Sequence, residues 1–132
     1  MKFLSINLLI TVCVITCGQA NLPDSLAGTW EGKSICQIRP SPCNDEIAVY
    51  HITRTDKPNT YHIVMNKVVD GKEEDMAEYD YHFDLASKTL SCWDDAHKIA
   101  WTFHVTGNHM EGTLTFQNKI YRIIRLTRSG TQ

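Results

Sequence analysis

Apolar and polar side chains alternate along this chain from residue 28 onward, in short runs separated by turn residues. The pattern is clearest over residues 76–85, where every second side chain is apolar and most of those between are acidic. A period of two places alternate side chains on opposite faces of a β-strand, so one face of each run is expected to be buried. For this run the buried face is predicted to hold Ala77, Tyr79, Tyr81, Phe83 and Leu85, and the solvent face Glu78, Asp80, His82 and Asp84.

The same alternation predicts eight strands and no long helix. Asp70-Gly71 is typical of a tight hairpin turn. Residues 39–42 contain two prolines, which lack the N–H donor that a central strand needs. We interpret the acidic run 73–75 as a solvated loop and residues 128–132 as a frayed tail. The predicted strands cover residues 28–37, 47–54, 60–69, 76–85, 89–93, 98–106, 110–116 and 119–127.

All the predicted connections are short. Parallel neighbours would need long crossovers, so neighbouring strands are expected to be antiparallel. The predicted fold class is all-β: an eight-stranded antiparallel up-and-down meander barrel, closed between its first and last strands. Closure would bury the apolar face and remove the free edges. An open sandwich of two sheets, built from the same strands, is the alternative.

Residues 1–20 are predicted to be a signal peptide and not part of the fold. Lys2 gives a positive start, residues 3–16 are mostly apolar, and Ala20 ends a small-residue cleavage site. The apolar run is short for a membrane span, and no second run of about 20 apolar residues follows it. Residues 21–132 are then expected to form a single exported domain.

The signal segment has a second interpretation. Val14-Ile15-Thr16-Cys17 resembles the lipobox of bacterial lipoproteins, whose cysteine becomes the lipidated N-terminus; it departs from the motif at Thr16. Processing at Cys17 would give a periplasmic, membrane-anchored protein, whereas cleavage after Ala20 would give a secreted one.

Net charge and motifs narrow the function classes. Cleavage after Ala20 removes Lys2 and no acidic residue, so the net charge of −2 becomes one unit more negative. This balance argues against a nucleic-acid binder and against strong attachment to anionic lipid. The chain has no Gly-x-Ser-x-Gly, phosphate loop or His-Glu-x-x-His, so neither a cofactor nor catalysis is expected, although a triad can assemble across a fold.

Three cysteines follow the signal segment. Cys36 and Cys43 bracket a proline-containing segment, and a disulfide there would close a loop of about 8 residues and contribute about 2.5 kcal/mol. Cys92 is left over and is interpreted as a small buried hydrophobic residue. The sequence also permits a bridge from Cys92 to either Cys36 or Cys43.

Gly28-Thr29-Trp30, near the start of a secreted eight-strand meander, resembles the Gly-x-Trp signature of the lipocalins and the wider calycin superfamily. The resemblance implies that Trp30 packs across the closed base of a barrel, with a basic residue of the last strand over its ring. Arg122 and Arg125 are the candidates for that residue. The chain is shorter than typical lipocalins and shows no helix after the last strand.

The aromatic side chains on the inward faces are the first candidate site. They either line a pocket for an apolar or amphipathic molecule or fill the barrel, whose interior is only just wide enough for its own side chains. Tyr79 and Tyr81 favour a pocket, because two inward phenols need hydrogen-bond partners. The candidate ligand-binding residues are Trp30, Tyr79, Tyr81, Phe83, Trp101, Phe103 and Arg122, with Phe116 as a further inward ring.

Arg122 has two interpretations. Residues two apart in a strand lie on the same face, so Arg122 is expected on the face of Ile124 and Leu126. From there it is able to point inward and meet a ligand carboxylate. Stacking on Trp30 is the preferred role, and the two roles exclude each other.

The histidines and acidic pairs do not predict a metal site. A transition-metal site needs imidazoles about 2 Å from one ion, and no closely spaced histidine pair is present. The acidic pairs at 45–46 and 94–95 do not match a calcium-ligand spacing. The histidines that could share an outer face, interpreted as solvated, are His51, His62, His82 and His104.

The leading expectation is therefore an exported barrel that binds or carries a small hydrophobic or amphipathic molecule. The alternative is a solid-core protein-binding or inhibitor module that acts through the loop between Cys36 and Cys43. An enzyme is the third and weaker class.

Overall fold

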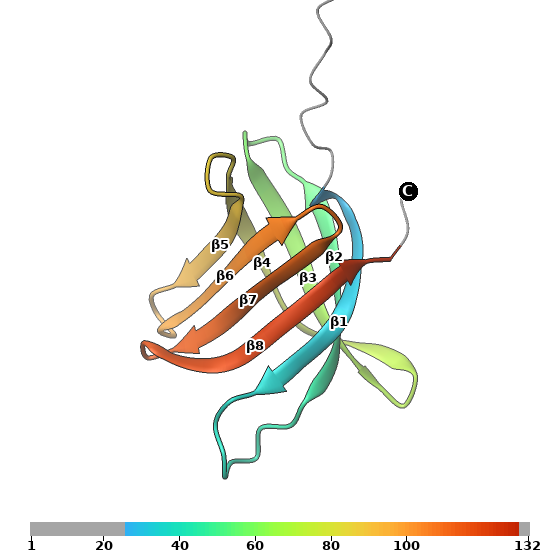
Figure 1. Cartoon of the computed structure of the whole chain (residues 1–132), viewed down its shortest axis with the longest axis vertical. Coiled ribbons are helices and arrows are strands. Elements are labelled where there is room, and N and C mark those ends of the chain that lie inside the picture. Colours follow the sequence, from blue (N-terminus) through green and yellow to red (C-terminus); the bar gives the residue numbers. More distant parts are fainter. Residues whose placement is uncertain (1–25, 130–132) are drawn as a thin grey trace, which may run out of the picture.

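The computed structural model describes residues 26–129 as a closed barrel of antiparallel strands, each paired with its neighbours in chain order (Figure 1). The predicted signal peptide, residues 1–20, and the lipobox residue Cys17 lie outside the described residues. Within residues 26–129 no helix has the length and apolar character needed to cross a bilayer. The strands are β1 (Gly28–Cys36), β2 (Glu46–Arg54), β3 (Thr60–Val69), β4 (Lys72–Asp84), β5 (Thr89–Asp94), β6 (Ile99–Thr106), β7 (His109–Phe116) and β8 (Lys119–Arg128).

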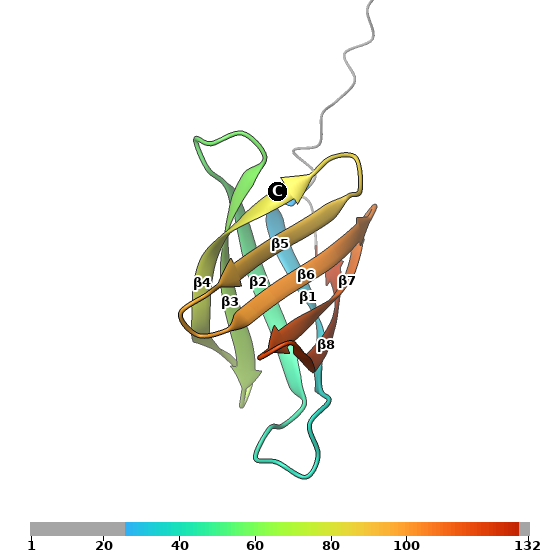
Figure 2. The ribbon, with the colours of Figure 1, turned by 90° about the vertical axis from the view of Figure 1, so that its left-hand side faces the viewer.

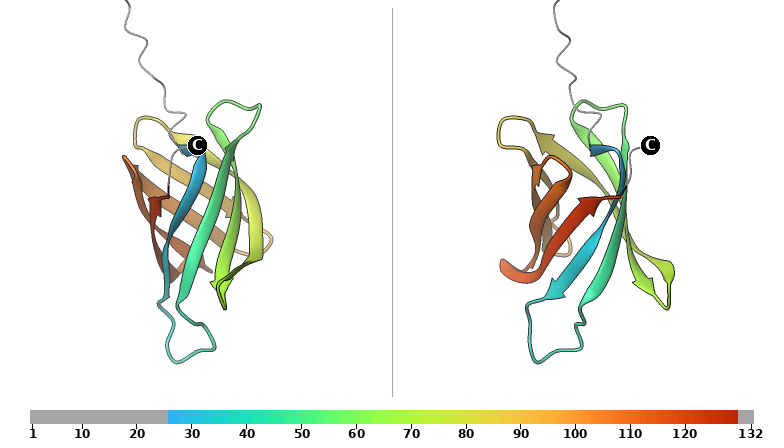
Figure 3. Two further views of the ribbon diagram at one scale, coloured as in Figure 1. Left: turned by 90° about the vertical axis from the view of Figure 1, so that its right-hand side faces the viewer. Right: turned by 45° about the vertical axis from the view of Figure 1, so that its right-hand side comes forward.

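The barrel closes between its first and last strands. β1 and β8 pair from Trp30 opposite Arg128 to Cys36 opposite Arg122. In Figure 3, the strands β2 and β3 on one side of the barrel run at an angle to β5–β7 on the opposite side, and β1 and β8 lie side by side where the sheet closes. The predicted eight-stranded meander barrel is confirmed, and the open sandwich is excluded because β1 and β8 are paired directly.

Two glycines permit close approaches between strands. A Cβ atom at Gly32 would collide with the backbone carbonyl oxygen of Arg125 in β8, and one at Gly112 would collide with the carbonyl oxygen of Thr102 in β6. Only glycine lets the backbone come this close. β1 therefore approaches β8 closely at Gly32, and β7 approaches β6 closely at Gly112.

β4 begins earlier than the sequence indicated. The acidic run 73–75 is part of the strand and not a loop, because a register shift beside Asn66 continues the pairing of β3 and β4 as far as Lys72. Glu73 accepts a hydrogen bond from the side chain of Asn66 and lies 2.7 Å from His51. Both contacts lower the pKa of the Glu73 carboxyl, and the hydrogen bond with His51 has the larger effect. The charges of the run are thus compatible with strand structure because all three side chains are exposed to solvent.

Two predicted inward side chains are exposed. Leu85 is 48% exposed because β4 ends at Asp84 and the chain turns there. Phe116 is 42% exposed, and it follows a register shift between Leu114 and Thr115 in β7. Both predictions were wrong because a single period of two was extended past the point where the pairing ends or shifts.

The two ends of the barrel differ. One end, which we call the tryptophan end, holds Trp30 together with the β2–β3, β4–β5 and β6–β7 connections. The other, which we call the mouth, holds the β1–β2 loop and the β3–β4, β5–β6 and β7–β8 turns (Figure 1). Interior side chains are packed most tightly from the tryptophan end to the middle. The fully buried side chains there are Leu26, Trp30, Ile52, Ile63, Met65, Tyr81, Leu90, Phe103 and Ile124.

Trp30 is sealed at the base by Arg128. The indole Nε1 donates a hydrogen bond to the carbonyl oxygen of Leu26 at 3.0 Å, and the Arg128 guanidinium carbon lies 4.8 Å from the ring centroid. Arg128 also donates to the carbonyl oxygen of Ala27. The expectation that Arg122 or Arg125 would cover the ring is wrong. The pairing places Arg128 opposite Trp30, so this residue belongs to β8 and not to a frayed tail.

The seam between β4 and β5 is the least paired part of the barrel. Only three residue pairs join these strands, from His82 opposite Ser91 to Asp84 opposite Thr89. Beyond them toward the mouth, β4 continues with pairing to β3 alone (Figure 2). The rest of this seam is spanned by side chains, including the hydrogen bond from the Tyr79 hydroxyl to Asp94.

Arg128→Ala is expected to lower the free energy of unfolding by about 1–2 kcal/mol, because it removes the cation–π contact with Trp30 and a partly buried hydrogen bond. Urea denaturation of the variant and the parent protein measures this loss. Arg125→Ala is the matched control: its ion pair with Glu111 is 61% exposed on both sides and should contribute about 0.5 kcal/mol or less. Equal losses in the two variants would contradict the role of Arg128.

Candidate functional site

The structure divides the predicted ligand-binding residues into two groups. Trp30, Tyr81, Phe83 and Phe103 are buried in the packed part of the core. Tyr81 contacts both Trp101 and Phe103, with ring centroids 6.4 Å and 6.3 Å away. The remaining three, Tyr79, Trp101 and Arg122, lie nearer the mouth. A site open to a ligand is therefore expected in the mouth half of the barrel, and the other rings support it from below.

Both inward phenols have partners within the protein. The Tyr81 hydroxyl donates to the sulfur of Met65 at 3.1 Å, and the Tyr79 hydroxyl donates to Asp94 Oδ2 at 3.0 Å. Burial raises the pKa of Tyr81 well above its usual value, whereas the hydrogen bond to Asp94 is the main cause of the raised pKa of Tyr79. The hydrogen-bond requirement of the phenols is thus met without a ligand.

Asp94 forms a polar group at the rim of the mouth. Its carboxylate accepts from the Tyr79 hydroxyl and from the backbone N–H of His97, and His97 Nδ1 lies 2.7 Å from Oδ2. The His97 contact is the main cause of the lowered pKa of Asp94, and the Tyr79 hydrogen bond adds to it. The side chain of His97 is 70% exposed. A phenol, a carboxylate and an imidazole are therefore connected from the barrel wall to solvent.

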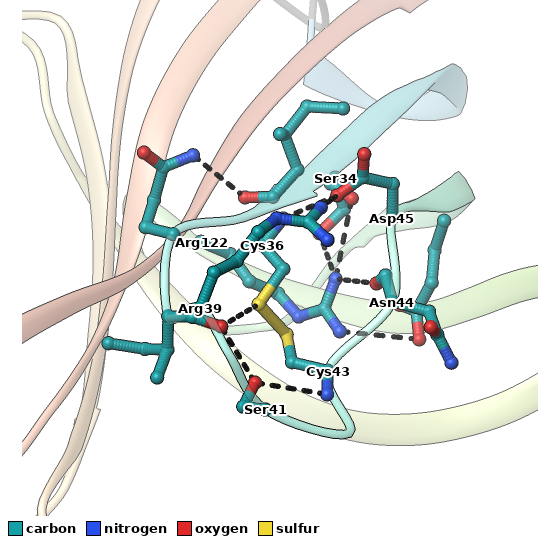
Figure 4. The surroundings of a disulfide bond; sticks show 12 residues. Ser34, Cys36, Arg39, Ser41, Cys43, Asn44, Asp45 and Arg122 are labelled. Atoms are coloured by element: carbon teal, nitrogen blue, oxygen red, sulfur yellow. Dashed lines mark hydrogen bonds and ion pairs between the residues drawn. A yellow bond between two sulfur atoms is a disulfide. The ribbon is translucent and has the colours of Figure 1, made fainter.

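Arg122 points inward and joins three segments at the mouth (Figure 4). One terminal nitrogen, Nη1, donates to the side chain and carbonyl oxygen of Ser34 and to the carbonyl oxygen of Asn44. The other, Nη2, lies 3.4 Å from Glu46 Oε1, which is also 4.0 Å from Lys67 Nζ. The side chains of Arg122 and Glu46 are only 10% and 17% exposed. Arg122 therefore ties β8 to β1, to the loop and to β2, and does not reach Trp30.

The second carboxylate oxygen of Glu46 differs from the first. Glu46 Oε2 is buried and has no hydrogen-bond partner within the described part of the chain. A buried acceptor without a donor is unfavourable, because it has lost its hydration without replacement. The mouth thus has an unmet requirement for an N–H or O–H donor beside its ion pair.

The loop between β1 and β2 is cross-braced (Figure 4). Cys36 and Cys43 form the predicted disulfide. Asp45 Oδ1 accepts from the backbone N–H of Cys36 at 3.0 Å and from Arg39 at 2.7 Å, and the hydroxyl of Ser41 accepts from the backbone N–H of Cys43. The exposed tip of the loop is therefore held rigidly beside the mouth.

An apolar cavity lies at the mouth, with a volume of about 240 Å³. Ile99, Leu114, Phe116 and Tyr121 line it. Leu114 is directly opposite Arg122 in the pairing of β7 and β8, and the Arg122 guanidinium carbon lies 5.8 Å from the centroid of the Tyr121 ring. The cavity therefore adjoins the buried ion pair.

A larger groove of about 940 Å³ lies on the outer side of β1, β6, β7 and β8. Its walls include Glu111 and Arg125, which pair with each other at 3.2 Å and are both well exposed. None of the predicted ligand-binding side chains lines this groove. The mouth cavity is the better candidate because it adjoins buried charge.

Cys92 is a free, buried cysteine, as interpreted from the sequence. Burial is the main cause that raises the pKa of its thiol to about 11, so the neutral thiol predominates near neutral pH. Tyr81 lies within hydrogen-bonding distance of it. Cys92 therefore behaves as a core side chain, and no bridge joins it to Cys36 or Cys43.

Two histidines of the outer face, His51 and His62, interact with carboxylates. His62 Nδ1 lies 2.8 Å from Asp80, and His62 Nε2 lies 3.4 Å from Glu78. His51 lies between Thr29 and Glu73. Within residues 26–129 no group of three or more histidine, cysteine, aspartate or glutamate side chains is close enough to hold a metal ion.

Several residues of the mouth were not predicted. Glu46 shares its parity with Ala48 and Tyr50, so alternation along β2 would have placed it inward. Asp94 likewise shares parity with Cys92. The inward positions of Glu46 and Asp94 were not predicted because both residues occur in acidic clusters beside turns. A solvated side chain is the usual interpretation of such a position.

Arg122→Leu is expected to lower the free energy of unfolding by about 3 kcal/mol, because it leaves the Glu46 carboxylate largely buried without its guanidinium partner. Adding Glu46→Gln should restore part of the loss, since a neutral amide costs less to bury. Urea denaturation measures both effects, with Arg125→Leu as the exposed control. An unchanged stability in Arg122→Leu would show that the guanidinium does not hold the mouth together.

The pKa of His62 is expected to lie above its ordinary value, mainly because of the hydrogen bond with Asp80. A raised pKa means that the folded state favours the imidazolium. The resulting stabilisation is complete below the ordinary pKa of about 6.5 and is lost as pH rises through the raised value. Asp80→Asn should lower the pKa of His62 in an NMR titration, whereas Asp84→Asn should leave it unchanged. A raised pKa that survives Asp80→Asn would rule out this cause.

Comparisons of the chain with protein-family models, with curated proteins and with solved structures give no match. The mouth has three features: an apolar cavity, an adjoining buried ion pair, and the contacts of Tyr79, Asp94 and His97 at the rim.

Proposed function

We propose that this barrel binds a small amphipathic molecule at its mouth. The apolar part of the ligand would occupy the cavity between Ile99, Leu114, Phe116 and Tyr121, and its polar part would lie toward Arg122. The observation that carries the proposal is the position of this cavity beside a buried ion pair. Such sites bind by burying apolar surface, at roughly 25 cal/mol per Å², and orient the ligand with a few polar groups.

The size of the cavity limits the ligand. Drug-sized ligands occupy pockets of roughly 300–1,000 Å³, and about 240 Å³ lies below that range. Below the mouth, Trp101 and Tyr81 are buried and contact each other. The proposed ligand is therefore compact, with one or two rings or a short chain, and not a long acyl chain that runs along the barrel axis.

The calycin resemblance and export are parts of the same proposal. The Cys36–Cys43 disulfide is consistent with an oxidising compartment, where small exported proteins use such bonds. A secreted binding barrel, or one anchored through Cys17, would meet its ligand outside the cytoplasm.

Protein recognition by the β1–β2 loop is the second candidate function. The disulfide and the Arg39–Asp45 ion pair hold the exposed loop in one conformation, which reduces the entropy lost on binding a partner. In this alternative the mouth cavity has no ligand, and the loop makes the contacts.

The fluorescent probe 8-anilinonaphthalene-1-sulfonate, which combines aromatic rings with one anionic group, tests the mouth. Leu114→Trp fills the cavity and should weaken probe binding at least tenfold, whereas Leu85→Trp, in the exposed β4–β5 turn, should not. Fluorescence titration gives the affinities, and circular dichroism checks that both variants are folded.

The same titration separates the two functions. Arg39→Ala loosens the loop and should leave probe affinity unchanged if the mouth cavity is the site. Equal probe binding by Leu114→Trp and the parent protein would exclude the cavity.

A further inference from the structure

The edge of β4 that faces β5 has no strand partner over most of its length. β4 has 13 residues, and its pairing with β3 extends from Lys72 to His82. β5 pairs with β4 only from His82 to Asp84. Among residues 26–129, β3 is the only strand that pairs with residues 72–81. Figure 2 shows this side of the barrel.

An unpaired strand edge presents a row of backbone N–H and C=O groups. Such an edge is a template for an added strand, from another copy of the chain or from a different protein. The side chains on it decide which occupant is favoured, because side chains directly opposite each other in a sheet interact.

The edge is strongly acidic. Residues 72–80 contain five carboxylates and one lysine. The basic groups that face them from the neighbouring strands are Lys67, opposite Glu74, and the two histidines His51 and His62. Even with both histidines protonated, the sum of these charges is negative. A second copy would place its own acidic β4 against this one, so like charges oppose self-pairing.

The two faces of the edge differ in character. Glu78 and Asp80 point outward and are exposed, whereas Ala77 and Tyr79 share the inward parity and pack against the core cluster. At the point where β4 and β5 separate lies a hollow of about 200 Å³, lined in part by Asp80 and Trp93. Trp93 is 67% exposed, the largest exposure among the large apolar side chains described. An added strand would therefore meet carboxylates and the exposed Trp93 on the outward face, and Ala77 and Tyr79 on the inward face.

We propose that the free edge of β4 binds an extended basic segment of a partner protein by strand addition. The segment alternates basic and apolar residues. Its backbone pairs with residues 72–80, its basic side chains lie opposite the outward carboxylates of β4, and its apolar side chains face Ala77 and Tyr79. This surface is separate from the apolar cavity between β6, β7 and β8.

A dye-labelled peptide, Lys-Val-Lys-Val-Lys-Val-Lys, tests the proposal by fluorescence anisotropy with the whole protein. The peptide should bind, and a Glu-Val peptide of the same length should not. A Lys-Val peptide that is N-methylated throughout keeps its charges but loses its N–H donors, so it should bind at least tenfold more weakly. Hydrogen exchange should show new protection of backbone amides within residues 72–80.

Variants localise the interaction. Glu78→Lys combined with Asp80→Lys should weaken peptide binding at least tenfold. Glu31→Lys combined with Glu111→Lys, on the outer side of β1 and β7, makes the same change of charge elsewhere and should have a smaller effect. Asp75→Lys is a further single variant of the edge, and circular dichroism confirms folding.

Three results would each overturn the proposal. Equal binding of the N-methylated peptide would show that charge alone attracts it. Protection outside residues 72–80 would place the site elsewhere. Dimerisation of the free protein with protection of the same residues would assign the edge to a second copy of the chain.

Discussion

The contact between Trp30 and Arg128 holds together the two strands on which closure of the barrel depends. β1 and β8 are the ends of the meander, and their pairing covers two edges that would otherwise be exposed. The indole fills the base and donates to Leu26, while the guanidinium covers its face. Two nitrogens of Arg128, Nε and Nη2, are buried without hydrogen-bond acceptors in the described part of the chain, and burial lowers the pKa of the group. The negative face of the indole offsets part of this cost.

Closure at the tryptophan end leaves a different chemistry at the other end. The same β1–β8 pairing that places Arg128 over Trp30 places Arg122 opposite Cys36, beside the disulfide and the loop. Arg128 meets an aromatic ring, whereas Arg122 meets a carboxylate and carbonyl oxygens. One inward row of β8 thus supplies a cation to each end of the barrel. The proposed ligand site therefore lies at the end where the inward cation meets polar groups and not an aromatic ring.

Strand number, pairing order and most inward positions could be predicted from the sequence, because a period of two is a local signal. Parity also identifies Arg125 as an outward residue, since it alternates with Ile124 and Leu126. Parity does not choose between Arg122 and Arg128 as the partner of Trp30. That choice depends on the register between strands that are about 100 residues apart in the chain, and no local pattern encodes it.

The mouth was less predictable for the same reason. Glu46 and Asp94 look like loop acids in the sequence, and their inward role arises only when strands from several parts of the chain converge. The early start of β4 was hidden because acidic side chains are typical of loops, although on an outward strand face they are equally well solvated. Register shifts such as that beside Asn66 are also invisible to a strict alternation.

Tyr79 links the two surfaces for which functions are proposed. Its ring lies 5.0 Å from that of Trp101 inside the barrel, and its hydroxyl reaches across the unpaired part of the β4–β5 seam to Asp94. Only three residue pairs of backbone hold this seam, so its strands separate with the loss of fewer backbone hydrogen bonds than any other neighbouring pair of strands. The strands that do not border this seam are paired on both sides along most of their length. Backbone pairing is therefore weakest where β4 leaves β5, and the hydrogen bond between the side chains of Tyr79 and Asp94 is a contact that spans the seam there.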